Sequence, residues 1–251
     1  MKSIIQVKDL VKKYPDVLAV NKISFDVYEN EIFGLLGPNG AGKTTTLEIM
    51  ETLKPMTSGD VTVKGMSIKK HSQKIKEIIG VQLQSAGYFT ELNLREIINI
   101  FADLYNVKID ALTLLDKVQL KDRARAKVTQ LSGGQRQRFS IATTLVHSPD
   151  IIFLDEPSTG LDPQARHKLW ELIEQIRNDG TTIVITTHFM DEAEYLCDRV
   201  AIIDEGKILD IAPPCELIDK LLANGFKKPR PKKEANLEDV FLSMTGKGLR
   251  E

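Results

Sequence analysis

The chain has 251 residues, of which 42% are hydrophobic and 27% are charged, and its formal net charge is −1. This composition is typical of a globular protein with one sizeable core, or one core and a subdomain. The near-zero charge excludes a general attraction to nucleic acid or anionic membranes. Two cysteines form no disulfide framework, the N-terminus lacks a signal-peptide core, and no run approaches the ~20 apolar residues of a membrane span. Work at a membrane would therefore require a partner.

Short segments of alternating apolar and polar residues near the N-terminus predict half-buried strands at residues 4–7, 23–27 and 61–63. Asn30 stands just before the next strand, where a tight turn would tolerate its left-handed backbone conformation. The apolar run Ile32–Leu36 then predicts a buried strand, and Thr44–Met50 has helical character.

The segment between that strand and that helix reads G-P-N-G-A-G-K-T-T, Gly37–Thr45. Glycines in such a loop let consecutive backbone N–H groups point at phosphate oxygens, and the helix that follows directs its positive dipole end at the same anion. Lys43 adds a charge for the β- and γ-phosphates, and the Thr44 hydroxyl is a magnesium ligand. A glycine-rich turn with a solvated lysine is the alternative, but the flanking strand and helix favour a nucleotide site. Its predicted residues are Gly37, Pro38, Asn39, Gly40, Ala41, Gly42, Lys43, Thr44 and Thr45.

The middle of the chain is predicted to be helical, with apolar residues three and four apart at 94–105 and a shorter helix at 112–118. Leu131–Gln135 then reads L-S-G-G-Q. Ser132 is a natural helix cap, and Gly133 and Gly134 open a backbone-lined concavity at the start of a helix. A capped surface helix would explain Ser132 but neither the glycines nor Gln135. We therefore interpret this motif as a second anion site.

The apolar run Ile151–Leu154 predicts a central strand of a parallel sheet, and it ends in two carboxylates. Ligands bind at the carboxyl ends of such strands. Asp155 is expected to hold magnesium through water, and Glu156 to orient or deprotonate the water that attacks the γ-phosphate. Pro157 argues that the strand stops and leaves Glu156 free to aim at the site. An exposed acidic strand end would be the preferred reading without the phosphate loop.

A loop and an amphipathic helix at 164–178 follow, and Trp170 on that helix is most simply a core residue. The β-branched run Thr181–Thr187 predicts a further parallel strand, which ends at His188. A histidine at this edge can reach the same crevice as Asp155 and Lys43. Although a lone histidine is more often structural, its neutral imidazole there would donate to the γ-phosphate or steady the attacking water.

Residues 1 to about 217 resemble the ATP-binding subunit of an ABC transporter, because several motifs occur in that family's order and approximate spacing. The phosphate loop matches the Walker A motif, Leu131–Gln135 the signature, and Ile151–Glu156 the Walker B motif. The resemblance also makes Tyr14 the aromatic residue that stacks on adenine and Gln84 the Q-loop residue and a magnesium ligand. It makes Asp162 the D-loop residue and His188 the switch histidine. The segments at 158–163, 186–194, 196–204 and 237–241 resemble most closely the drug- and antibiotic-export branch served by ABC-2 type permeases.

The resemblance implies an α/β fold with a P-loop NTPase core, a mostly parallel sheet, an N-terminal antiparallel β subdomain and an inserted α-helical subdomain at about 86–147. The cassette would occupy residues 1–225, and a basic linker with a short C-terminal helix would occupy 226–251. ATP and Mg²⁺ are the implied cofactors. Two cassettes, expected to be copies of one chain, would pack head to tail, so that Ser132 and Gly134 contact ATP bound by the partner and Asp162 touches the opposing site.

The implied location is the cytoplasmic face of the cell membrane, held there by a permease whose coupling helix enters a groove beside the helical subdomain. Tyr88, Phe89 and Leu92 would supply an apolar docking surface, although a buried role fits them equally. No nucleic-acid partner is expected. A soluble ABC ATPase acting on ribosomes or nucleic acid is the alternative, but such proteins generally carry two cassettes or long coiled coils. A non-hydrolysing sensor is disfavoured by Lys43, Asp155, Glu156 and His188.

Overall fold

The computed structural model describes residues 2–82 and 87–226. The chain divides into two compact units, residues 1–215 and 216–251, and helix α8 (Pro214–Ala223) spans the boundary. Gln84, the segment 237–241 and the basic linker from residue 227 onward lie outside the described residues. Within the described ranges, no helix is long and apolar enough to cross a bilayer.

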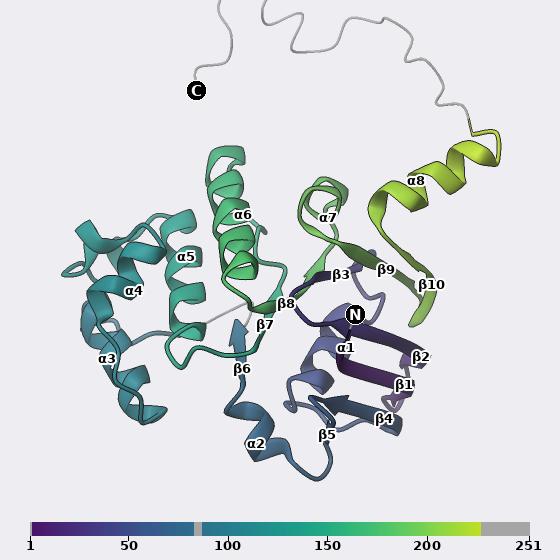
Figure 1. The fold of residues 1–251 in the computed structure, drawn as a ribbon, viewed down its shortest axis with the longest axis horizontal. Coiled ribbons are helices and arrows are strands. Elements are labelled where there is room, and N and C mark those ends of the chain that lie inside the picture. Colours follow the sequence, from purple (N-terminus) through teal and green to yellow (C-terminus); the bar gives the residue numbers. More distant parts are fainter. Residues whose placement is uncertain (1, 83–86, 227–251) are drawn as a thin grey trace, which may run out of the picture. The chain divides into compact units, whose positions relative to one another are not determined.

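The first sheet is antiparallel and has the strand order β2-β1-β4-β5 (Figure 1). Its strands are β1 (Ser3–Lys13), β2 (Leu18–Tyr28), β4 (Ser58–Val63) and β5 (Met66–Ser67). β1 is much longer than the alternating pattern predicts. The pairing register with β2 shifts between Val7 and Leu10, and Asp9 between them has φ 45°. This bulge breaks the two-residue alternation and hides the rest of the strand from a pattern search.

The second sheet has six strands in the order β10-β9-β3-β8-β7-β6, and all neighbours are parallel except β10 and β9. The central strands β3, β8 and β7 are buried at every residue, as expected for a sheet covered on both faces. The bounds are β3 (Ile32–Leu36), β6 (Ile79–Gln82), β7 (Ile151–Asp155), β8 (Thr182–Thr187), β9 (Arg199–Asp204) and β10 (Lys207–Ala212).

Helix α1 (Lys43–Met50) joins the two sheets into one core, because Leu47, Ile49 and Met50 pack in the same apolar cluster as side chains from both sheets.

The helical insertion gathers in one part of the cassette (Figure 1). It contains α3 (Leu94–Leu104), α4 (Ala111–Lys117), η1 (Lys121–Arg123), η2 (Val128–Gln130) and α5 (Gly133–Thr144). The remaining helices of the first unit are α2 (Ser72–Lys76), α6 (Pro163–Asn178) and α7 (Met190–Leu196). The predicted fold class is confirmed.

Glu51, which follows α1, is an acid buried in this core. Only 2% of the residue is exposed, and its Oε1 has no hydrogen-bond partner among the described residues. Burial, together with smaller contributions from the nearby carboxylates of Asp155 and Glu48, raises the pKa of Glu51 to about 8. The folded chain therefore favours the neutral carboxyl.

We expect the free energy of unfolding to fall as pH rises from about 4.5 to about 8, because the folded state retains the Glu51 proton over this range and the unfolded state does not. Glu51→Gln replaces the neutral acid with a neutral amide. It should raise the melting temperature at pH 8 by about 3 °C for each kcal/mol gained, and leave it nearly unchanged at pH 4.5.

Thermal unfolding of the nucleotide-free protein across this pH range measures the effect. Glu77→Gln, at an exposed position after α2, is the matched control. Equal melting temperatures for wild type and Glu51→Gln at pH 8 would contradict the raised pKa of Glu51.

Candidate active site

The loop between β3 and α1 curls around a cavity of about 310 Å³. Its lining includes Asn39, Gly40, Gly42, Lys43, Thr44, Thr45 and Glu156. Gly42 has φ 100°, and a Cβ there would lie 2.3 Å from the Ala19 carbonyl oxygen, so only glycine fits. Lys43 is 4% exposed, and its Nζ donates to the carbonyl oxygens of Gly37 at 2.9 Å and Pro38 at 3.0 Å. The loop thus holds one buried cation at the start of a helix, where an anion is favoured.

Asp155 ends β7 directly opposite this loop. Its Oδ1 accepts a hydrogen bond from the Thr44 hydroxyl at 3.2 Å and another from the Thr186 hydroxyl. Asp155 is 7% exposed. A carboxylate and a hydroxyl oxygen in contact are the hard oxygen ligands that Mg²⁺ prefers, so Thr44 and Asp155 fit the predicted metal site.

Glu156 leaves the strand with φ 45°, a left-handed conformation that is uncommon for a non-glycine residue. Its backbone N–H donates to Thr186, at 3.1 Å from the carbonyl oxygen and 3.0 Å from the hydroxyl. The turn sends its carboxylate toward two groups of the predicted site. Oε1 lies 3.5 Å from Lys43 Nζ, and Oε2 lies 3.2 Å from His188 Nδ1. Lys43, Asp155, Glu156 and His188 are therefore brought to one place, at the carboxyl ends of β7 and β8.

The L-S-G-G-Q motif is at the start of α5 (Figure 1). None of its residues lines this cavity. Ser132 and Gln135 form a reciprocal cap: Ser132 N donates to Gln135 Oε1 at 3.0 Å, and Gln135 N donates to Ser132 Oγ at 3.3 Å. Ser132 and Gly133 are exposed. Gly134 has a packing role as well, because a Cβ there would lie 2.7 Å from the Ala165 Cβ of α6.

Two further predicted residues also lie outside the group around Lys43. Asp162 caps α6, where its Oδ1 accepts from Ala165 N at 2.8 Å. Tyr14 is half-buried before β2, and Lys12 Nζ lies 5.0 Å from the centre of its ring. Of the predicted docking residues, Phe89 is 64% exposed, whereas the half-buried Tyr88 packs against Phe139 with ring centres 5.3 Å apart.

Thr186 is not among the residues predicted from the sequence, although it contacts both carboxylate-bearing residues. A threonine inside a β-branched run is indistinguishable from an ordinary strand residue. One signal was available in the sequence, because Thr186 is a polar residue two positions before His188. The pairing of β8 with β7 places this residue beside Asp155.

Known proteins resemble this chain in sequence and in fold. The family model described as "ABC transporter" matches residues 20–159. Nod factor export ATP-binding protein I of Burkholderia orbicola is 36% identical, over 98% of each chain. Linearmycin resistance ATP-binding protein LnrL of Bacillus subtilis is 37% identical, over 86% of this chain and 71% of that protein.

Among solved structures, a dimeric ATP-binding cassette in a post-hydrolysis state, bound to ADP and Pi, superposes with a TM-score of 0.74. It is 27% identical, over 84% of this chain and 98% of that one. These relatives give no support to a soluble ATPase acting on ribosomes or nucleic acid. The chain therefore belongs to the ABC transporter family and is an ATP-binding, ATP-hydrolysing subunit.

Proposed function

We propose that two copies of this chain close head to tail around two ATP molecules and thereby drive export through separate ABC-2 type permease subunits. The proposal rests on one observation: the phosphate-loop residues and the signature motif lie at different places on one cassette, so a single copy forms only half of an ATP site. Lys43, Thr44, Asp155, Glu156 and His188 gather at the phosphate loop, while the exposed cap at Ser132 offers a second helix N-terminus elsewhere on the cassette. A second copy facing the first would place its signature motif over this loop.

Within that dimer each residue has a defined task. Thr44 and Asp155 would hold Mg²⁺, with Gln84 as a further proposed ligand, and Lys43 would balance phosphate charge. Bound ATP supplies the γ-phosphoryl group that is transferred to water. Glu156 accepts the proton of that water, and His188, in contact with its Oε2, keeps the carboxylate aimed at the site. Tyr14 would stack on adenine, while Ser132, Gly134 and Asp162 would act on the ATP of the opposite copy.

Glu156→Gln should preserve ATP binding but reduce phosphate release at least about 100-fold, because the amide cannot accept the proton. The variant should also accumulate as an ATP-bound dimer in size-exclusion chromatography. Glu205→Gln is a matched control, since Glu205 is exposed in the β9–β10 hairpin and has a similar φ of 46°. Rapid phosphate release by Glu156→Gln would remove Glu156 from the catalytic role.

Thr186→Val should lower ATPase activity or raise the Mg²⁺ requirement by about 10- to 100-fold, because it removes the hydroxyl that holds Asp155 and Glu156. Titration of ATPase activity with Mg²⁺ measures this. Thr182→Val, a buried change at the opposite end of the same strand, controls for packing. Equal behaviour of the two variants would count against the role of Thr186.

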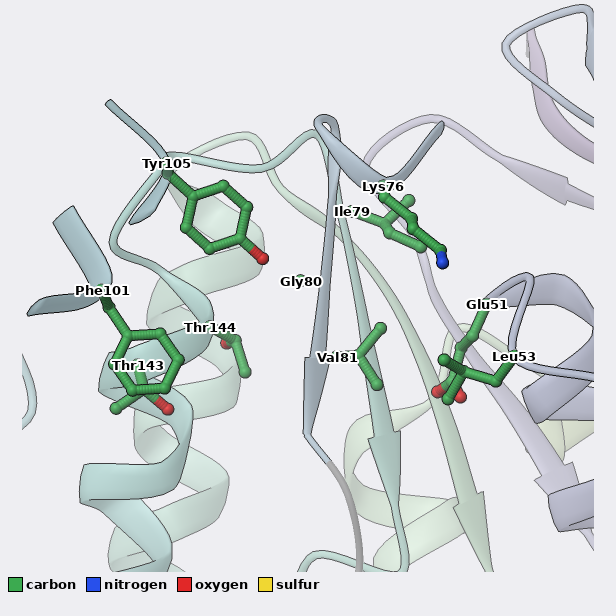
Figure 2. Close-up of a pocket in the computed structure, with 10 residues that line it drawn as sticks. All are labelled: Glu51, Leu53, Lys76, Ile79, Gly80, Val81, Phe101, Tyr105, Thr143 and Thr144. Carbon is green, nitrogen blue, oxygen red and sulfur yellow. The ribbon is translucent and has the colours of Figure 1, made fainter. Parts of the chain in front are cut away.

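A groove of about 250 Å³ beside β6 is the proposed permease-docking site. Figure 2 shows the rings of Phe101 and Tyr105 on one side of β6, and Glu51, Leu53 and Lys76 on the other. Leu53 is 48% exposed and Tyr105 is 40% exposed. A helix that presents apolar side chains would cover these residues, and this would hold the cassette at the cytoplasmic face of the membrane.

Leu53→Glu should reduce the fraction of tagged protein recovered with native membranes, because it places a charge in the apolar contact, while the purified cassette keeps its ATPase activity. Leu209→Glu changes a leucine that is 66% exposed on β10 and should leave recovery unchanged. Mass spectrometry of the material bound to wild type should identify an integral membrane protein. Co-purification of ribosomes or nucleic acid instead would overturn the transporter reading.

A further inference from the structure

Glu192, in the first turn of α7, is a fully buried acid outside the cavity that holds the catalytic group. Its Oε1 accepts a hydrogen bond from the Ser158 hydroxyl and another from Trp170 Nε1 at 3.0 Å. Trp170 Nε1 also lies 3.1 Å from Ser158 Oγ, so the three side chains form one closed group. Its other oxygen, Oε2, has no hydrogen-bond partner among the described residues. Burying a carboxylate costs free energy unless it is well hydrogen-bonded. Glu192 therefore differs from the apolar residues that usually fill a core.

The three members of this group come from three segments that each carry a residue of the proposed site. Ser158 lies two positions after Glu156, and Trp170 lies on α6, the helix that Asp162 caps. Glu192 lies four positions after His188. These hydrogen bonds therefore connect the segments that carry Glu156, Asp162 and His188.

A second set of contacts joins α6 to α7 around the same group. Arg166 on α6 forms an ion pair with Asp191 at 3.1 Å, and its guanidinium lies 5.3 Å from the Trp170 ring centre. Tyr195 stacks on Trp170 with ring centres 5.0 Å apart. The Arg166 pair and the stacked ring surround the buried hydrogen bonds, so a shift of the His188 segment would be transmitted to the loop at Ser158.

We propose that Glu192 is a positioning residue that ties the loop at 157–161 to the segment carrying His188, so that Glu156, Asp162 and His188 change position together. This inference rests on the roles proposed above for those three residues. Glu192 does not touch the reacting atoms. It sets the relation between the water-activating carboxylate and the D-loop, which would face the other ATP. Trp170, the chain's single tryptophan, is a built-in reporter of this group.

Three small changes test the group: Glu192→Gln removes the charge and keeps one acceptor oxygen, Ser158→Ala removes the hydroxyl, and Trp170→Phe removes the indole donor. Each should lower the kcat for ATP hydrolysis by about 10-fold while the Kd for ATP stays within about twofold, because the nucleotide-binding loop is not altered. Ser158→Thr keeps the hydroxyl and should restore most of the activity lost in Ser158→Ala. Glu194→Gln, an exposed neighbour on α7, should behave as wild type.

Fluorescence of Trp170 gives a readout that loss of stability alone would not produce. Addition of Mg²⁺ and ATP to wild type should shift its emission, whereas folded Glu192→Gln and Ser158→Ala should show a much smaller shift. Wild-type kcat in both folded variants would overturn the inference. A parallel loss of kcat and ATP affinity that follows the melting temperature would also overturn it, because the residue would then be purely structural.

Failure of the proposed function has a different signature. In that case Glu156→Gln would hydrolyse ATP like wild type, whatever happens at Glu192.

Discussion

The parallel register between β7 and β8 is the constraint on which the site depends. Asp155 stands opposite Thr186, and the Thr186 hydroxyl and carbonyl bond to both Asp155 and the Glu156 backbone. Two consecutive carboxylates would point to opposite faces in a continuing strand. Here Thr186 holds Asp155 against Thr44, while the left-handed turn at Glu156 sends the next carboxylate to Lys43 and His188. The residues proposed to hold the metal ion and to activate water are therefore joined by a single peptide bond.

Most residues of the candidate site could be predicted from the sequence, because the carboxyl ends of parallel strands meet at one edge of a sheet. The phosphate loop, Asp155, Glu156 and His188 each follow a run recognisable as a core strand. Thr186 could not be predicted, since its role comes from register with a strand about 30 residues away. The full length of β1 was also hidden, because the bulge at Asp9 interrupts its alternation. Contacts that depend on pairing rather than on composition are those that sequence patterns miss.

Two buried carboxylates of the cassette differ in how their charge is accommodated. Glu51 has an unpartnered oxygen within the described residues, and burial raises its pKa, so its neutral form suits the core beside α1. Glu192 instead accepts two hydrogen bonds on one oxygen and links α7 to the loop before Asp162. Gly134 connects the same region to the signature motif, because α5 and α6 approach too closely there for a larger residue. The proposed catalytic and dimer-facing residues therefore share one packed framework.

In the proposed dimer, each ATP site is completed by the signature motif of a second copy. Lys43→Ala removes the cation of the phosphate loop. Gly133→Asp places a negative charge at an exposed signature position, where an added Cβ would lie 3.8 Å from the Leu161 side chain. The decisive measurement is the ATPase activity of the two inactive variants after mixing. If the sites are shared, activity should recover to about a quarter of the wild-type value, since half of the dimers are mixed and each of these has one intact site of two. A mixture no more active than the average of its two components would contradict sites shared between two copies.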